Sequence, residues 1–560
     1  MPIELSMEDL LAKFKDGQEP RDYQRPTMEE VLESLKNNHD VAVQLPTGSG
    51  KSFIYIPLAL ATASKGYRVC ILAPTNLIVD QITNEFLPYF QITEEPLIVK
   101  GIENYQCLFT KQRADYAICT PDMRSAVCEK DYCSCDVLEI NKKLEERGII
   151  VTNFHKFLST PVKNKFDLII IDDSHGFESA KDGKFITTLN YRHIDAMYNK
   201  HEKSKDLLSQ VAGDFMDIFD DTFESVPPGK LDRRVGNDDI DKIAKIQNVA
   251  ELKEEMASLD MYDRDVCYDM INFIEACKKS TLNTFYVIKE FYNQEERLQS
   301  SLISRNSEEY QNMIIRKTFG DARVVFVSAT MGDVERHVRY CTNRDYELVQ
   351  LDVVPKIRPE KIENWFNGLK IFQISDFPEK EGLELAVIRT AEIIPKLSGK
   401  ILLLFKNYRD QKRAQEILES SITTPITFID DSYNTESVQK LVKGAGIIMA
   451  TASSRLWEGI DIKDLGYVFI FHLPFIKPPV YIAKKLQFPY IQRKMLIRLQ
   501  QGIGRLIRKE NDTGICVVYA HNLNKYKNLA TFSDDYRKRI EVVEFKDIES
   551  SILKEVKKWQ

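Results

Sequence analysis

The 560-residue sequence has no apolar run long enough to cross a membrane. Its most apolar window, 465–476, contains His472 and Pro474 and stops at Lys477, far short of the ~20 apolar residues that a spanning helix needs. The first residues are acidic and amphipathic and lack the basic start and unbroken apolar run of an export signal. We therefore expect a cytoplasmic protein, or a nuclear one in a eukaryote, with no membrane partner.

The sequence also lacks a fixed-period repeat and any low-complexity tract. Hydrophobic residues at 43% and charged residues at 29% exclude a disordered or collagen-like chain. A chain of this length is too long for one hydrophobic core and predicts several structural units. The net charge of −7 argues against a uniformly basic nucleic-acid coat.

Short apolar runs recur along the chain and are separated by segments with helical character. Runs that are apolar throughout, rather than alternating, are typical of parallel strands buried on both faces. They fall into two series and predict two doubly wound α/β domains. The first series comprises 40–45, 68–73, 148–152, 167–171 and 323–327, and the second comprises 400–405, 446–449, 467–470 and 515–519.

The stretch 190–317 shows no comparable strand run. Apolar residues at helical spacing occur instead, as at Met270, Phe273, Ile274 and Cys277. The sequence predicts an acidic, mostly helical insertion within the first α/β domain.

A glycine-rich loop follows the first strand. In such a loop, backbone N–H groups turn toward a phosphate, the following helix adds partial positive charge, Lys51 reaches the β- and γ-phosphates, and Ser52 can hold Mg²⁺. Leu45 stands where the usual pattern begins with glycine, and a glycine-rich turn that binds nothing is the alternative. The strand–loop–helix context favours an ATP site made of Pro46, Thr47, Gly48, Ser49, Gly50, Lys51 and Ser52.

A later buried strand ends in two carboxylates, Asp172 and Asp173. Asp172 is suited to Mg²⁺, and Asp173 to orienting and deprotonating the attacking water. Near the other end of the chain, Arg505 and Arg508 lie three residues apart and hence on one helical face. Arginines that face a phosphate loop from another domain can stabilise the charge that develops during phosphoryl transfer.

Five of the ten cysteines fall within 107–135, whereas the others are scattered. Such a patch in an intracellular chain predicts a metal site. A second concentration lies at 477–509, which has nine basic residues and no acid. Cations neutralise phosphates, and the interleaved Tyr481, Phe488 and Tyr490 could stack on unpaired bases or belong to the core.

These motifs, in their order along the chain, resemble those of the XPD/DinG family of iron–sulfur superfamily 2 DNA helicases. The resemblance covers most of the chain. Arg21 and Gln24 resemble the adenine-reading element, Ala73-Pro74-Thr75 a segment that contacts the DNA backbone, Asp172 to His175 the DEAH box, Ser328-Ala329-Thr330 the coupling motif, Trp457-Glu458-Gly459-Ile460-Asp461 motif V, and Gln501 to Arg508 motif VI.

The resemblance implies two RecA-like P-loop domains, the first interrupted by a 4Fe-4S cluster domain and a helical arch. The expected boundaries are 1–100, 149–189 and 318–345 for the first domain, 101–148 for the cluster domain, 190–317 for the arch and 346–560 for the second domain. Nucleotide contacts are implied for Arg21, Gln24, Glu458, Gly459 and Asp461, and a catalytic role for Gln501.

For the metal, the resemblance favours a 4Fe-4S cluster on Cys107, Cys119, Cys128 and Cys135, with Cys133 as the alternative last ligand. Structural zinc is the rival, although the spacings lack paired C-x2-C knuckles.

The implied function is ATP-dependent unwinding by 5′-to-3′ movement on single-stranded or forked DNA, in repair or replication, by a monomer. The alternatives are a translocase that strips proteins or RNA–DNA hybrids, and a nucleic-acid binding scaffold with a degraded ATPase. Because the family has Glu where this chain has Asp173, we expect slow hydrolysis.

Overall fold

The structure is a computed structural model. It describes residues 2–106, 114, 136–146, 148–159, 165–203, 206–224, 233–246, 249–256, 259–292, 297–346, 349–376, 382–429, 435–451, 462–476 and 484–559.

The first domain is built on a seven-stranded parallel sheet, as the first series of apolar runs predicts. Alternate residues of its strands pack into two cores, one on each face, with Val41, Ile71 and Ile170 on one side and Ala42, Cys70 and Ile171 on the other. The strand order is β11 (Leu351–Val354), β1 (Asp40–Gln44), β10 (Arg323–Ser328), β5 (Leu168–Ile171), β2 (Val69–Ala73), β4 (Ile149–Asn153) and β3 (Leu97–Val99).

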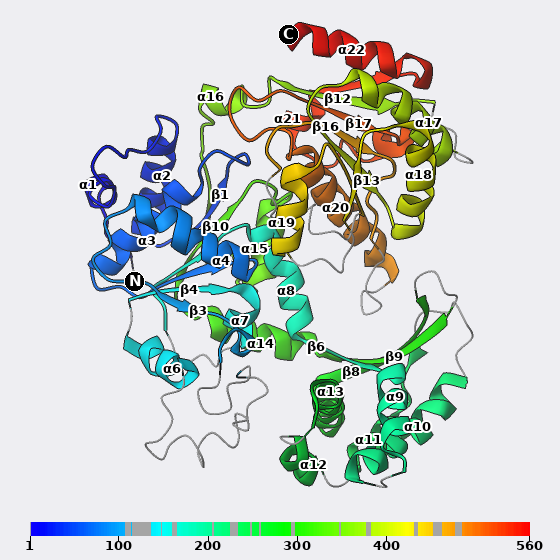
Figure 1. The fold of residues 1–560 in the computed structure, drawn as a ribbon. Helices are drawn as coiled ribbons and strands as arrows, with labels where there is room; N and C mark the ends of the chain where they lie inside the picture. The colour runs from blue at the N-terminus through cyan, green and yellow to red at the C-terminus, as the bar shows by residue number, and fades with distance from the viewer. Residues whose placement is uncertain are drawn as a thin grey trace.

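Helices cover both faces of this sheet (Figure 1). They are α1 (Met7–Leu11), α2 (Gln24–Lys36), α3 (Ser52–Ser64), α4 (Asn76–Gln81), α6 (Asp136–Glu146), α7 (Phe154–Ser159), α8 (Phe177–Lys184), α14 (Glu308–Phe319) and α15 (Val334–Thr342). Because β11 pairs with β1, the first sheet extends beyond the expected boundary at residue 345.

The second domain has its own seven-stranded parallel sheet, which contains all four runs of the second series. The order is β14 (Ile426–Ile429), β15 (Ile447–Thr451), β13 (Lys400–Phe405), β16 (Leu465–Ile470), β17 (Gly514–Val518), β12 (Leu369–Ile374) and β18 (Ile540–Val543). Its helices are α16 (Glu360–Glu363), α17 (Gly382–Ile393), α18 (Tyr408–Ser421), α19 (Thr435–Gly444), α20 (Lys484–Ile503), α21 (Asp534–Arg537) and α22 (Ile548–Trp559).

The insertion contains the helices that the sequence predicts and, in addition, strands that no apolar run indicates. The segment between α8 and α14, here called the insert, combines five helices with a four-stranded antiparallel sheet below the first domain (Figure 1). The strands, in the order β6, β9, β8 and β7, are Ile186–Asn190, Arg297–Asn306, Asn283–Tyr292 and Arg233–Arg234. The helices are α9 (Tyr191–His201), α10 (Leu207–Glu224), α11 (Asn237–Ala244), α12 (Val249–Glu255) and α13 (Met261–Lys278), the last of which contains the predicted helical pattern.

A search for continuous apolar runs misses the hairpin of β8 and β9 because its strands mix polar and apolar residues. Antiparallel strands with one covered face have this composition. The hairpin pairs ten residues with ten, from Asn283 opposite Asn306 to Tyr292 opposite Arg297.

Candidate active site

The phosphate loop lies between β1 and α3, at the carboxyl edge of the first sheet. Gly48 and Gly50 have φ values of +80° and +75°, a conformation that is free of strain only for glycine. Ser49 Oγ and Lys51 Nζ both donate to the Pro46 carbonyl, at 2.7 and 3.2 Å. Burial lowers the pKa of Lys51, while Asp173 and Asp172 oppose that shift.

The first residue of α2 and the residues just before it form hydrogen bonds to this loop. Gln24 Nε2 donates to the carbonyls of Ser49 and Gly50 at 2.9 and 3.0 Å, and the Tyr23 hydroxyl donates to Ser49 at 3.0 Å. Arg21 donates through its backbone N–H to Gln24 Oε1 and through its guanidinium to the Tyr23 hydroxyl. Arg21 and Gln24 therefore lie against the phosphate loop, where the amide of Gln24 fixes the loop backbone.

The two strand-end carboxylates face Lys51. Asp172 is buried and accepts a 2.9 Å hydrogen bond from the Tyr55 hydroxyl, and burial and Asp173 raise its pKa. Ser52 also contacts the Tyr55 hydroxyl, so oxygen donors from the loop helix and from β5 converge on one point. Such a set suits a hard cation such as Mg²⁺. Tyr55 has no place in the motifs that the sequence singles out.

His175 connects the acidic strand end to both the coupling motif and the second domain. Its Nδ1 lies 3.0 Å from Ser328 Oγ, and its Nε2 lies 2.6 Å from Gln501 Nε2. An amide nitrogen can only donate, so Nε2 accepts and Nδ1 carries the proton that is donated to Ser328. Three predicted motifs therefore meet at one imidazole.

The segment after α20 brings the two predicted arginines to the first domain. Arg508 is close enough to Lys51 to lower the pKa of that ammonium further, and its backbone lies directly on the phosphate loop. A Cβ built on Gly48 would lie 1.7 Å from the Arg508 carbonyl oxygen. Arg505 is buried. Because α20 ends at Ile503, both arginines lie in the non-helical segment that follows it, and the prediction of one shared helical face is wrong.

The predicted basic segment 477–509 is described from residue 484 onward, and its residues there are partly exposed and partly buried. Phe488 is 57% exposed, which leaves its ring free to meet a base. Arg493 and Lys494 are buried and pair with Glu178 of α8, at 2.6 and 3.0 Å. Sequence reasoning missed Glu178 because an acid in a short helix carries no signal of its partner.

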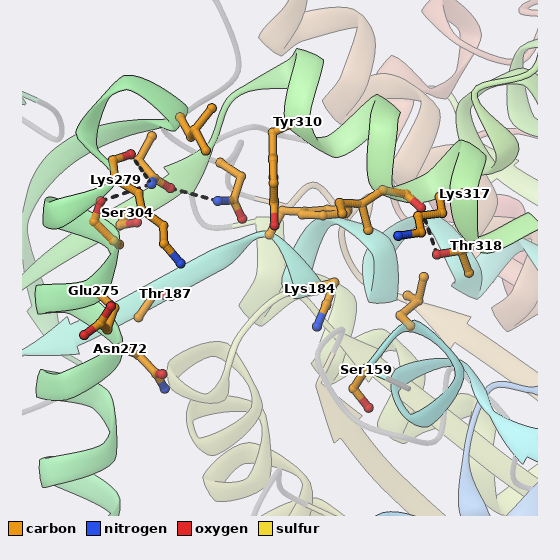
Figure 2. A pocket seen from close by; sticks show the side chains of 17 residues that line it. Ser159, Lys184, Thr187, Asn272, Glu275, Lys279, Ser304, Tyr310, Lys317 and Thr318 are labelled. Atoms are coloured by element: carbon orange, nitrogen blue, oxygen red, sulfur yellow. Dashed lines mark hydrogen bonds between the residues drawn. The ribbon is translucent and has the colours of Figure 1, made fainter. Parts of the chain in front are cut away.

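A cavity of about 480 Å³ lies where the insert joins the first domain (Figure 2). Its lining includes three lysines, Lys184, Lys279 and Lys317, and one carboxylate, Glu275. Figure 2 shows Tyr310 of α14 between Lys279 on the insert side and Lys317 on the domain side.

Two groups of predicted site residues lie outside the described residues. One is the motif V set Glu458, Gly459 and Asp461, and the other is the whole cysteine patch. Among the residues that the structure describes, no group of three or more His, Cys, Asp or Glu could hold a metal ion. The five scattered cysteines are buried free thiols, as expected of core residues.

Comparison with known proteins agrees with the geometry. Residues 17–205 match the family model described as type III restriction enzyme, res subunit, and residues 390–539 match the helicase C-terminal domain. ATP-dependent DNA helicase YoaA of Escherichia coli is 22% identical over 93% of this chain and 94% of its own. ATP-dependent DNA helicase XPD of Sulfolobus acidocaldarius is 20% identical over 88% and 94%.

Solved structures share the fold. An XPD helicase superposes with a TM-score of 0.64 over 94% of this chain and all of its own, at 14% identity. Two parallel-sheet domains, one with a phosphate loop and the other with an arginine-bearing segment that reaches this loop, are the arrangement of a helicase-type P-loop ATPase. Along most of its length the chain is similar to XPD/DinG-type helicases of superfamily 2. Among the described residues, no helix is both long and apolar enough to cross a bilayer.

Proposed function

We propose that the protein is an ATP-dependent DNA helicase that moves 5′-to-3′ along single-stranded DNA and unwinds the duplex ahead of it, in repair or replication. The observation that carries this proposal is the meeting of both domains at the acidic strand end. Gln501 of α20 contacts His175 there, while the Arg508 backbone lies on Gly48. Relatives named as DNA helicases along nearly their whole length support it.

ATP binds to the loop 46–52, with Lys51 on the β- and γ-phosphates. Ser52 and Asp172 would hold Mg²⁺, which would supply positive charge next to the transferring phosphate. Asp173 orients the attacking water and accepts its proton. Arg505 and Arg508 stabilise the developing negative charge from the second domain. Glu458, Gly459 and Asp461 complete the nucleotide contacts.

Hydrolysis moves the strand because the nucleotide lies between two domains. Closure brings the arginines toward the phosphates, and product release lets the domains part. His175 links this cycle to Ser328 of the coupling motif. The DNA path includes the exposed ring of Phe488 and the cavity with Lys184, Lys279, Lys317 and Tyr310, where cations meet phosphates and rings stack on bases.

The cysteine patch holds a 4Fe-4S cluster on Cys107, Cys119, Cys128 and either Cys135 or Cys133. Described residues within 101–148 support an inserted unit at this place. Tyr105 and Val137 pack with Ala114 in a small core separate from those of the sheet. Visible absorbance with stoichiometric iron supports the cluster, and a colourless protein that contains zinc contradicts it.

The deciding experiment is strand displacement on duplexes with a single-stranded tail at the 5′ or the 3′ end, and on forks. We expect unwinding from the 5′ tail, ATP hydrolysis that nucleic acid stimulates, and the loss of both in Lys51→Ala. Unwinding from the 3′ tail alone refutes the direction. Hydrolysis at the wild-type rate by Lys51→Ala refutes the site.

A further inference from the structure

A buried carboxylate lies at the contact between the two domains. The Glu178 side chain on α8 is only 2% exposed, and the guanidinium of Arg493 grips it with two hydrogen bonds of 2.6 Å each. Lys494 Nζ lies 3.0 Å from the same carboxylate. Both cations belong to α20, so this ionised group of the first domain takes its main counter-charges from the second domain.

This pairing depends on the closure of the two domains. A buried charge is tolerated only when it is paired and hydrogen-bonded. Although burial opposes ionisation, Lys494, His337 and Arg493 hold the pKa of Glu178 well below its usual value. When the domains part, Glu178 keeps only His337 of its own domain among these partners. The contact therefore favours the closed arrangement, unlike an ion pair made within one domain.

The first-domain partner of Glu178 leads directly to the acidic strand end. His337 of α15 is buried, with Nδ1 2.8 Å from Glu178 Oε1 and Nε2 3.2 Å from Ser174 Oγ. Burial opposes protonation of the ring, but Cys341 and Glu178 outweigh it and raise the pKa of His337 to about 10. A protonated ring donates from both nitrogens, to Glu178 and to Ser174. Ser174 directly follows the two catalytic aspartates.

The second domain thus reaches the acidic box, residues 172–175, along two separate routes. Gln501 touches His175 directly, and Arg493 acts on Ser174 through Glu178 and His337. Arg493 and Gln501 are eight residues apart on α20, roughly 12 Å along its axis. The hydrogen bonds and ion pairs of Glu178 and Arg493 join them to each other, to His337 and to Lys494, so we assign the second route to positioning residues.

We propose that Arg493, Lys494 and Glu178 form an interdomain latch that sets the position of the acidic box through His337 and Ser174 whenever the domains close. This inference rests on the proposed ATP-hydrolysing function. The latch transmits closure to Asp172 and Asp173 independently of the arginines that face the phosphates.

The test uses Arg493→Met and Arg493→Lys, with Ser174→Ala to remove only the last link. We expect Arg493→Met to lower kcat for nucleic-acid-stimulated ATP hydrolysis at least about tenfold, with little change in the KM for ATP. Arg493→Lys keeps the charge but not the two-pronged grip and restores part of the rate. Because both residues act along one route, the double variant Arg493→Met with Ser174→Ala is no slower than Arg493→Met alone.

Arg344→Met is the matched control. Arg344 forms a buried pair with Asp40, but both residues belong to the first domain. Its loss lowers thermal stability and leaves kcat per folded molecule unchanged. If Arg493→Met behaves like Arg344→Met, or if the Arg493 and Ser174 effects multiply, the latch is refuted and the pair is merely structural.

A second readout does not need catalysis. Hydrogen exchange of the peptide covering 172–184 is expected to rise in Arg493→Met, but not in Arg344→Met, in the presence of a non-hydrolysable ATP analogue. Equal exchange in the two variants overturns the latch. Failure of the proposed function has a different signature, since wild-type protein would then show no hydrolysis that Lys51→Ala abolishes.

Discussion

Replacing Gly48 by alanine tests whether contact between the domains at the phosphate loop is needed for turnover. The new Cβ would lie 1.7 Å from the Arg508 carbonyl oxygen, whereas ordinary contacts begin at 3.4 Å. The obstacle is backbone, which cannot rotate away as a flexible side chain can. Closure must therefore stop about 1.7 Å short or shift the loop by the same amount.

The size of the effect follows from that displacement. A misplacement of about 1 Å in a catalytic arrangement costs roughly 100-fold in rate. The left-handed backbone of residue 48 adds about 1 kcal/mol of strain for alanine, which lowers stability rather than the rate per folded molecule. We expect Gly48→Ala to lower kcat at least about 100-fold and to keep nucleotide affinity within an order of magnitude.

Two other glycines separate these contributions. Gly17 has φ +80° and nothing within 4 Å of a Cβ built on it. Gly17→Ala therefore adds backbone strain without any steric clash. Gly50 has φ +75° and would meet only the Gln24 amide nitrogen, at 2.7 Å. Nucleic-acid-stimulated ATP hydrolysis and binding of a fluorescent nucleotide are measured for all three variants. If Gly48→Ala turns over like Gly17→Ala, closure at this contact is not required.

Two further predictions concern the loop clamp and the insert. Gln24→Ala removes both hydrogen bonds to the loop carbonyls and is expected to weaken nucleotide binding by roughly tenfold in a titration, whereas Glu19→Ala on the nearby surface leaves it unchanged. In the insert, hydrogen bonding to Asp263, opposed by burial and aided by Asp206, raises the pKa of His201. The contribution of protonated His201 to the stability of the insert is therefore complete below the ordinary pKa of 6.5 and is lost as pH rises through the raised pKa. We expect hydrogen exchange in α9 to increase across that pH window. The variant His201→Gln cannot titrate and should show no such increase.

Much of the fold is predictable because parallel strands that are buried on both faces consist of continuous apolar runs in the sequence. All nine apolar runs are strands of the two sheets. In a parallel sheet the carboxyl ends share one edge, so the residues at the ends of β1, β5 and β10 meet there although Pro46 and Thr330 lie 284 residues apart in the sequence. This rule brings the loop 46–52, the acidic box and the coupling motif together before any contact is known.

The search for continuous apolar runs does not find several short strands and strands at the edges of the sheets. β3 has only three residues, and β11 and β14 each have a polar residue within their four, so none of them forms a continuous apolar run of four. The hairpin of β8 and β9 fails for a different reason, since its residues alternate between a covered and an open face. A search for a period of two over 283–306 is the signal that could have found it.

The contacts between domains were beyond sequence reasoning. Glu178 and Arg493 are separated by 315 residues, and each residue type is common on protein surfaces. Only the packing of α20 against α8 turns them into a buried pair. The cysteine patch and motif V remain predictions, because they lie outside the described residues.

Asp173, which stands where the resembled family has glutamate, has an unusual backbone conformation. Its φ of +44° and ψ of +48° place it in the left-handed region, which aspartate tolerates better than glutamate. The variant Asp173→Glu therefore brings the carboxylate closer to the attacking water but adds backbone strain at residue 173. The strain difference is below about 1 kcal/mol, equivalent to at most about fivefold, whereas one methylene of reach near 1 Å is worth roughly 100-fold. The gain from the longer side chain exceeds the loss from strain, so we expect Asp173→Glu to raise kcat by about twentyfold at unchanged KM. A rate equal to or below wild type, in a protein of equal thermal stability, would show that the left-handed turn already places the shorter carboxylate where the water needs it.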